Sequence, residues 1–192
     1  MIFGSVSRND VRLFTALCGF VVLLSYYFGV KKLSDPKKLW GGIPESWQRI
    51  QIPFILLAAF GYLVFWWVSL FQLELSELNG LRWPWSDSDG QGLGRLMLAF
   101  AVFLIPSSLW LESTSFHVAK NYSWSPILVV GTLFVASIGN IMLGLLAYSA
   151  YVDGVQGSFI MLIGAVMISI QLILNDLFVW SWKFPWRPSM SS

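Results

Sequence analysis

The chain has 192 residues, of which 56% are hydrophobic and 11% charged, and its mean hydropathy is +0.68. A soluble domain of this size carries about 25% charged residues and cannot bury so much apolar surface. We therefore expect a single-domain integral membrane protein. Soluble enzymes are excluded, and so are disulfide scaffolds, because Cys18 is the one cysteine. A net charge of +2 is too small to indicate a nucleic-acid partner.

Five apolar runs are long enough to cross a membrane. Crossing about 30 Å of hydrocarbon takes roughly 20 residues at about 1.5 Å each. None of the runs alternates as a barrel strand does, so the sequence predicts an all-α bundle of five transmembrane helices. The predicted spans are Leu13–Val30, Ile52–Leu73, Leu93–Leu111, Pro126–Tyr148 and Ser158–Trp182.

Basic residues in the loops predict the orientation of the bundle. Eight of them fall on the side of the first loop and the C-terminal tail, and four fall on the other side. Since cytoplasmic loops are enriched in Lys and Arg, we expect the C-terminus in the cytoplasm and the N-terminus outside or in a lumen. The eight are Lys31, Lys32, Lys37, Lys38, Arg49, Lys120, Lys183 and Arg187.

Small and polar residues predict which helix faces pack together, because helices in lipid associate through close approach and polar contacts. One stripe recurs every four residues along the fourth span, and a second follows the fifth span. We expect the two stripes to face each other. They comprise Thr132, Ala136, Asn140, Gly144 and Tyr148, and Gly164, Ile168, Gln171 and Asn175.

Asp176 is the acidic residue that we place deepest within a span, about 9 Å inside the predicted boundary. Such a carboxylate is costly in lipid and usually faces the bundle interior or a wet cavity. Two interpretations stand side by side. Asp176 forms an ion pair with Lys183, seven residues further along the same helix face, or it joins Gln171 and Asn175 as the polar floor of a ligand cavity.

The loop between the first two spans is rich in tryptophan, glycine and proline. Trp40 and Trp47 predict a structured lid at the membrane surface, or a loop that these rings anchor at the interface. His117 has no metal-ligand pattern around it, and we interpret it as a surface residue in the loop after the third span. No nucleophilic triad is present in the sequence.

Several short motifs match one known family. The matching residues are Lys38, Trp40, Pro44 and Trp47 in the first loop, Gly61 and Tyr62 in the second span, and Asn175 and Trp180 in the fifth. With five spans and 11 tryptophans, this layout resembles the tryptophan-rich sensory protein/translocator protein (TspO/MBR) family. The resemblance implies a five-helix bundle whose first loop covers a cavity for porphyrins, sterols or related apolar ligands.

The sequence thus favours a non-enzymatic membrane protein that binds a small apolar or amphipathic ligand in the cytoplasmic half of the bundle. A tetrapyrrole or sterol as that ligand comes from the resemblance alone. Alternatives are a structural or assembly subunit of a larger membrane complex and, third, a small transporter. Membrane lipids are the expected partners, and the sequence is compatible with a homodimer or a larger membrane complex. The candidate ligand contacts are Trp40, Trp47, Asn140, Gln171, Asn175 and Asp176.

Overall fold

A computed structural model describes residues 6–32, 36–120, 122–184 and 186, and these residues form helices and loops without a strand. Five helical stretches of 24 to 29 residues are apolar enough to cross a membrane. The prediction of an all-α five-helix bundle is confirmed, and the protein is an integral multi-pass membrane protein. The membrane-crossing elements are α1 (Arg8–Lys32), α2 (Glu45–Trp67) with η2 (Val68–Gln72), α4 (Gly92–Lys120), α5 (Ser125–Val152), and α6 (Ser158–Ser169) with η3 (Ile170–Trp180) and α7 (Ser181–Lys183).

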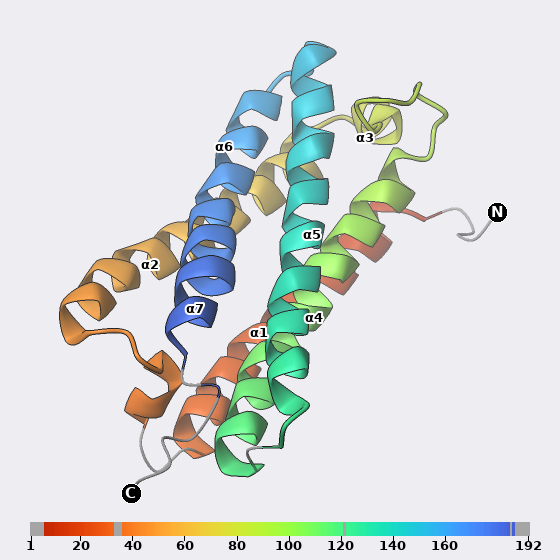
Figure 1. Ribbon diagram of the computed structural model, residues 1–192. Coiled ribbons are helices and arrows are strands. Elements are labelled where there is room, and N and C mark those ends of the chain that lie inside the picture. The colour runs from red at the N-terminus through yellow and green to blue at the C-terminus, as the bar shows by residue number, and fades with distance from the viewer. Residues whose placement is uncertain (1–5, 33–35, 121, 185, 187–192) are drawn as a thin grey trace, which may run out of the picture.

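The two ends of the bundle carry different connections (Figure 1). The N-terminal end holds Ser7, the short helix α3 (Leu75–Gly80) and the loop of residues 81–91. The C-terminal end holds η1 (Pro36–Trp40), the start of α2 and α7. We use these two names for the ends below.

The helices pack in the order α1, α4, α5, α6, α2 across the bundle. The arm of α2 and η2 meets α1 near the N-terminal end, where Trp66 Nε1 donates a hydrogen bond to Thr15 Oγ1 at 2.8 Å. Towards the C-terminal end, α1 and α2 separate (Figure 1). The contacts of α2 along the bundle are therefore mainly with α6 and η3.

Two glycines set the crossing of α2 and α6. A Cβ atom on Gly61 would lie 2.7 Å from the carbonyl oxygen of Gly164, and one on Gly164 would lie 2.6 Å from that of Gly61. A side chain at either position would overlap the facing backbone. The two glycines therefore allow the close backbone approach that small residues give to helices in membranes. The predicted stripe on α5 meets α6 beside the predicted stripe there: Asn140 Nδ2 donates to the Ala165 carbonyl at 3.3 Å, whereas Gly164 faces α2.

Two membrane helices end in π-helical segments, in which the backbone bonds run from i to i+5. The segment η2 spans five residues, and η3 spans eleven. The α-helices also extend beyond their apolar runs, because α4 continues to Lys120 and so includes Glu112 and His117. Glu112 thus lies inside a membrane-crossing helix, as Asp10 and Glu45 do, although the predicted span ending at Leu111 left it outside.

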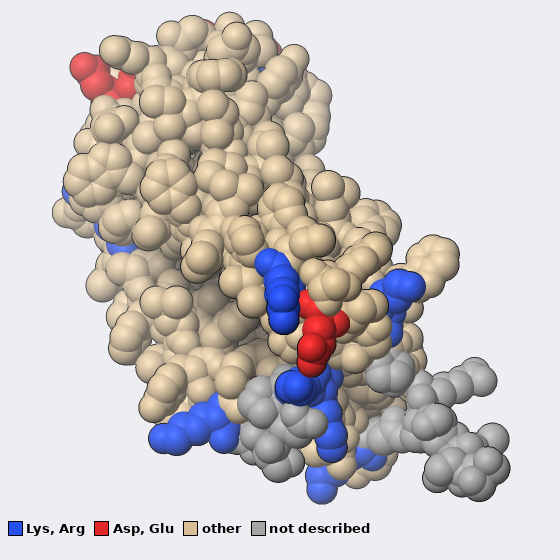
Figure 2. Space-filling view, turned by 90° about the vertical axis from the view of Figure 1, so that its left-hand side faces the viewer, with Lys and Arg blue, Asp and Glu red and all other residues tan. Residues whose placement is uncertain are grey.

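Lysine side chains concentrate at the C-terminal end. Figure 2 shows blue side chains gathered there, below a broad face with few charges. That uncharged face fits the hydrocarbon layer, and the basic end fits a headgroup region. The exposed basic residues at this end are Lys31, Lys37, Lys38, Arg49, Lys120 and Lys183.

Candidate functional site

Asp176 lies in η3 and accepts a hydrogen bond from the amide side chain of Gln171, which in turn accepts one from Asn175. Gln171 Nε2 donates to Asp176 Oδ1 at 2.7 Å, and Asn175 Nδ2 donates to Gln171 Oε1 at 3.2 Å. On an α-helix, residues five apart are rotated by about 140° because each residue turns about 100°. The wider π-helical turn brings i+5 above i, so the unusual backbone of η3 makes this pairing possible.

Of the two interpretations of Asp176, the structure does not form the ion pair with Lys183. Within the described part of the chain, the ion pairs are Lys37–Glu45, Arg82–Asp153 and Arg95–Asp89. The sequence argument assumed α-helical geometry, in which seven residues return to the same face. The π-helical turns of η3 change that register.

An aromatic cluster lies near Asp176. The ring centroids of Tyr26 and Trp110 lie 6.0 Å apart, and those of Trp110 and Trp180 lie 5.3 Å apart. Tyr26 also lies within electrostatic range of the Asp176 carboxyl. The rings come from α1, α4 and η3, so three elements build an apolar wall beside one carboxylate.

Two buried N–H donors in the same half of the bundle have no hydrogen-bond partner among the described residues. They are Gln51 Nε2 and Trp110 Nε1, and Gln51 is only 5% exposed. Gln51 lies ten residues, about 15 Å, beyond the Gly61–Gly164 crossing towards the C-terminal end, where α2 packs on η3. A buried donor left unsatisfied costs about 1–3 kcal/mol, so each of them needs a partner.

Sequence reasoning missed both donors. Gln51 lies one residue before the predicted start of the second span at Ile52, and Trp110 lies one residue before the predicted end of the third span at Leu111. A glutamine beside an apolar run is a weak signal, since it is usually solvated. Because α2 begins at Glu45, Gln51 lies within the helix, and its side chain is buried there.

The first loop packs on the end of the last helix. Trp180 Nε1 donates to the Leu39 carbonyl at 2.7 Å, and the Gly42 N–H donates to the Lys183 carbonyl at 3.1 Å. Trp40 is half-buried in this loop, whereas Trp47, in the first turns of α2, is 49% exposed. The loop is thus attached beside the aromatic cluster that borders Asp176.

Asn140 lies apart from the hydrogen bonds around Asp176. Its amide Nδ2 donates to Ser169 Oγ at 2.7 Å and to the Ala165 carbonyl. Asn140 is fully buried between α5 and α6. In this structure it joins two helices rather than Gln171, Asn175 and Asp176.

The interpretation of His117 as a surface residue is wrong. It lies inside α4, is 3% exposed and contacts the rings of Phe184 and Trp186. Ser125 Oγ donates to the Tyr122 carbonyl at 2.6 Å, so it accepts a hydrogen bond from His117 Nδ1, also at 2.6 Å. The sequence placed His117 outside because the predicted third span ended six residues earlier.

Two pockets lie at the N-terminal end, and none of the six predicted ligand contacts lines either of them. The structure thus brings together Gln171, Asn175 and Asp176, and leaves Asn140 and Trp47 separate. By fold, the protein is a five-helix membrane bundle with a polar cluster in one half. No family model, curated protein or solved structure matches the chain, so the likeness to the TspO/MBR family stays a prediction.

Proposed function

We propose that the protein binds a small amphipathic ligand next to Asp176, in the half of the bundle at the C-terminal end. One observation carries the proposal: a carboxylate inside the membrane, bound by the neutral amide of Gln171, lies in the same half as two N–H donors without a partner among the described residues. Intramembrane ionisable residues mark functional sites by default. Water or a ligand with both donor and acceptor character would satisfy all three groups.

The surrounding side chains specify the chemistry of that ligand. An apolar ring system would pack against Tyr26, Trp110 and Trp180. A hydroxyl group both donates and accepts, so it would donate to Asp176 and accept from Gln51 or Trp110. A sterol-like or lipid-like molecule has this combination, and a porphyrin-like ligand is suggested by the family resemblance alone.

The loop of residues 39–42 would cover this ligand at the membrane surface. Its attachment to Trp180 and Lys183 supports the role of a lid. We also propose that the C-terminal end faces the cytoplasm, because the exposed lysines gather there. The protein acts in this proposal by binding, and we assign no reaction to it.

The decisive experiment is ligand identification followed by binding to variants. The protein is purified in mild detergent, and co-purified small molecules are identified by mass spectrometry. A fluorescent sterol and protoporphyrin are then titrated against the wild type and Asp176→Leu. We expect the variant to lose about tenfold in affinity for the probe that the wild type binds, as the loss of a charged hydrogen bond implies.

The matched control is Asp87→Leu, which removes an exposed carboxylate at the other end of the bundle and leaves affinity unchanged. Gln51→Leu adds a second readout. It removes an unpartnered buried donor, so it raises the stability of the ligand-free protein while it lowers affinity. If Asp176→Leu binds both probes as well as the wild type, the proposed site is refuted.

A subunit of a larger membrane complex is the second candidate, and the outer face of α1 favours it. This helix packs mainly on α4, and it leaves large apolar side chains exposed on its other faces. A defined set of protein partners that co-purifies in place of a small ligand would support this function. The exposed side chains are Leu13, Leu17, Phe20, Leu23 and Tyr27.

A further inference from the structure

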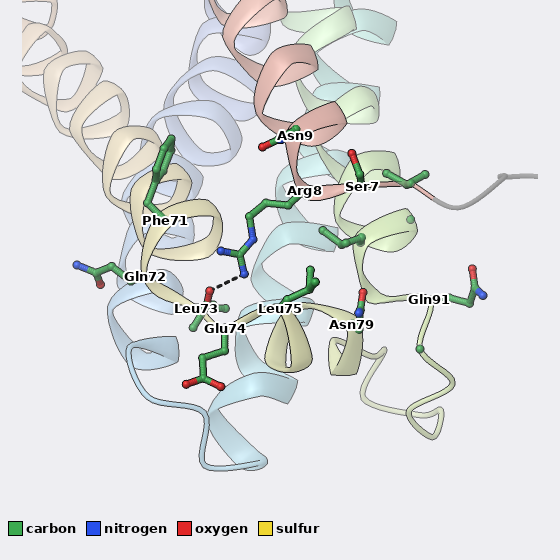
Figure 3. Close-up of a pocket in the computed structure, with 14 residues that line it drawn as sticks. Ser7, Arg8, Asn9, Phe71, Gln72, Leu73, Glu74, Leu75, Asn79 and Gln91 are labelled. Atoms are coloured by element: carbon green, nitrogen blue, oxygen red, sulfur yellow. Dashed lines mark hydrogen bonds between the residues drawn. The ribbon is translucent and has the colours of Figure 1, made fainter.

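A pocket of about 910 Å³ opens at the N-terminal end (Figure 3), and Asp176 does not line it. The start of α1, the end of η2, the helix α3 and the start of α4 enclose it. Phe71, Leu75 and Leu93 supply apolar lining, and Asn79 and Gln91 supply amide groups. This volume lies in the range of small-molecule sites, and the mixture of surfaces suits an amphiphile.

Arg8 is the cation of this pocket. Its Nη2 donates to the Leu73 carbonyl at 2.8 Å (Figure 3). Its Nε is buried and has no hydrogen-bond partner among the described residues, and the ion pairs given above do not include Arg8. A guanidinium has five N–H donors in a fixed fork that matches phosphate oxygens, so Arg8 retains capacity for an anion.

The acidic groups nearby are already engaged by their own helices. The side chains of Glu74 and Glu77 form a reciprocal capping box at the start of α3. The Asp10 carboxylate accepts from the backbone N–H and the hydroxyl of Ser7. In Figure 3 the Glu74 carboxylate points away from the guanidinium of Arg8. The pocket therefore offers its positive charge to an incoming group.

The pocket also lies at a membrane boundary. Arg8 is the first residue of one membrane-crossing helix, and Gln72 is the last residue of another. We propose that this pocket binds the phosphate group of a phospholipid, with Arg8 on the phosphate and the lipid's glycerol and chains along the apolar lining. This site is separate from the proposed ligand site, and neither depends on the other.

The first test compares two arginines in the detergent-solubilised full-length protein. Arg8→Gln removes the cation that lines the pocket. Arg12→Gln is the matched control, because Arg12 also binds a carbonyl of η2 but does not line the pocket. Binding of dioctanoyl phosphatidylglycerol, measured by native mass spectrometry, should fall about tenfold in Arg8→Gln and stay within about twofold in Arg12→Gln.

A second pair of variants tests the pocket without changing Arg8, and its control reports any effect of the substitution on folding. A Cβ atom at Gly94, which lines the pocket, would meet nothing within 4 Å, and the same holds for Gly131 on α5. Gly94→Phe adds a ring to the pocket wall at a position with room for its Cβ atom, and it should abolish retention of the lipid. Gly131→Phe carries the same substitution away from the pocket and should leave retention unchanged.

Two further probes separate the sources of the phosphate group. Dioctanoylglycerol, which has the same chains and no phosphate, should bind about tenfold more weakly than the phospholipid. Inorganic phosphate at the same concentration should leave the lipid bound. Equal binding of the two lipids, or full retention by Arg8→Gln and Gly94→Phe, would refute the proposal. Displacement of the lipid by inorganic phosphate would refute a lipid site in favour of a free-anion site.

Discussion

The guanidinium of Arg12 caps the end of a neighbouring helix by binding the carbonyl oxygen of Leu70. Its Nε lies 3.1 Å and its Nη2 2.5 Å from that oxygen. Helix C-termini leave carbonyl groups without intrahelical partners. An α-helical turn would direct the backbone N–H of Glu74 to the Leu70 carbonyl, but this N–H is bound to the Glu77 side chain. The first turns of α1 thus supply hydrogen-bond donors to the carbonyl groups at the end of η2. The positive charge of Arg12 also interacts favourably with the negative end of the helix dipole.

Replacing Arg12 should therefore lower the stability of the fold. Arg12→Met keeps much of the aliphatic stem and removes the fork, which leaves the Leu70 carbonyl without this donor. We expect a loss of about 1–2 kcal/mol, seen as a fall of several degrees in the unfolding temperature in detergent. Arg12→Lys should recover part of this loss. Equal unfolding temperatures for the wild type and Arg12→Met would contradict the capping role.

The Gly61–Gly164 crossing should tolerate no added methyl group. Gly61→Ala and Gly164→Ala each place a Cβ atom within 2.7 Å of the facing backbone oxygen, and overpacking of this kind costs about 1–3 kcal/mol. Gly144→Ala is the control, because its Cβ would lie 3.7 Å from Ala165 Cβ, an ordinary contact. Alanine also favours helix over glycine, so Gly144→Ala should be neutral or stabilising in thermal unfolding.

The pair of Arg82 and Asp153 should make stability depend on pH in acid. Arg82 donates to both carboxylate oxygens, at 2.9 and 2.7 Å, and these bonds hold the pKa of Asp153 below its usual value of 3.8. Because the folded pKa is depressed, this contribution is present above the unfolded pKa and is lost as the pH falls through the folded pKa.

The measurement for this pair is the unfolding temperature of the wild type and Asp153→Asn between about pH 3 and about pH 7. The wild type should be the more stable protein at neutral pH, and the difference should shrink in acid. Other carboxyl groups titrate in both proteins, so they cancel in the difference. A difference that stays constant across this range would show that the pair does not contribute in the proposed way.

Helix number and class followed from hydropathy, because an apolar run of about 20 residues has few alternatives in a membrane. Hydropathy did not predict the residues at which the helices begin and end. Polar residues such as Arg8 and His117 belong to the helices through tertiary contacts that a hydropathy window does not contain. The same limit explains why the guanidinium–carbonyl bonds between α1 and η2 were not predicted.

The candidate site was predicted in part. Asp176, Asn175 and Gln171 stood out because polar residues in a span are rare. Their actual pairing depends on a π-helical segment of eleven residues, and local sequence propensity is a poor guide to such segments since they form at few sites. The pocket beside Arg8 could not be predicted, because its lining joins the start of α1 to residues 71–94, with Arg8 and Leu73 separated by 65 positions along the chain.

The bond between Trp180 and the Leu39 carbonyl offers a test of the lid. Trp180 is buried and donates from Nε1 at 2.7 Å, so Trp180→Phe keeps an aromatic ring and removes the donor. The loop would lose an anchor worth about 1 kcal/mol. Hydrogen exchange of the Gly42 and Ile43 amides, which donate to Lys183 and Trp40, should therefore become about fivefold faster. Trp182→Phe changes a ring that is 86% exposed and should leave this exchange unaltered. Equal exchange in the two variants would mean that Trp180 does not hold the loop in place.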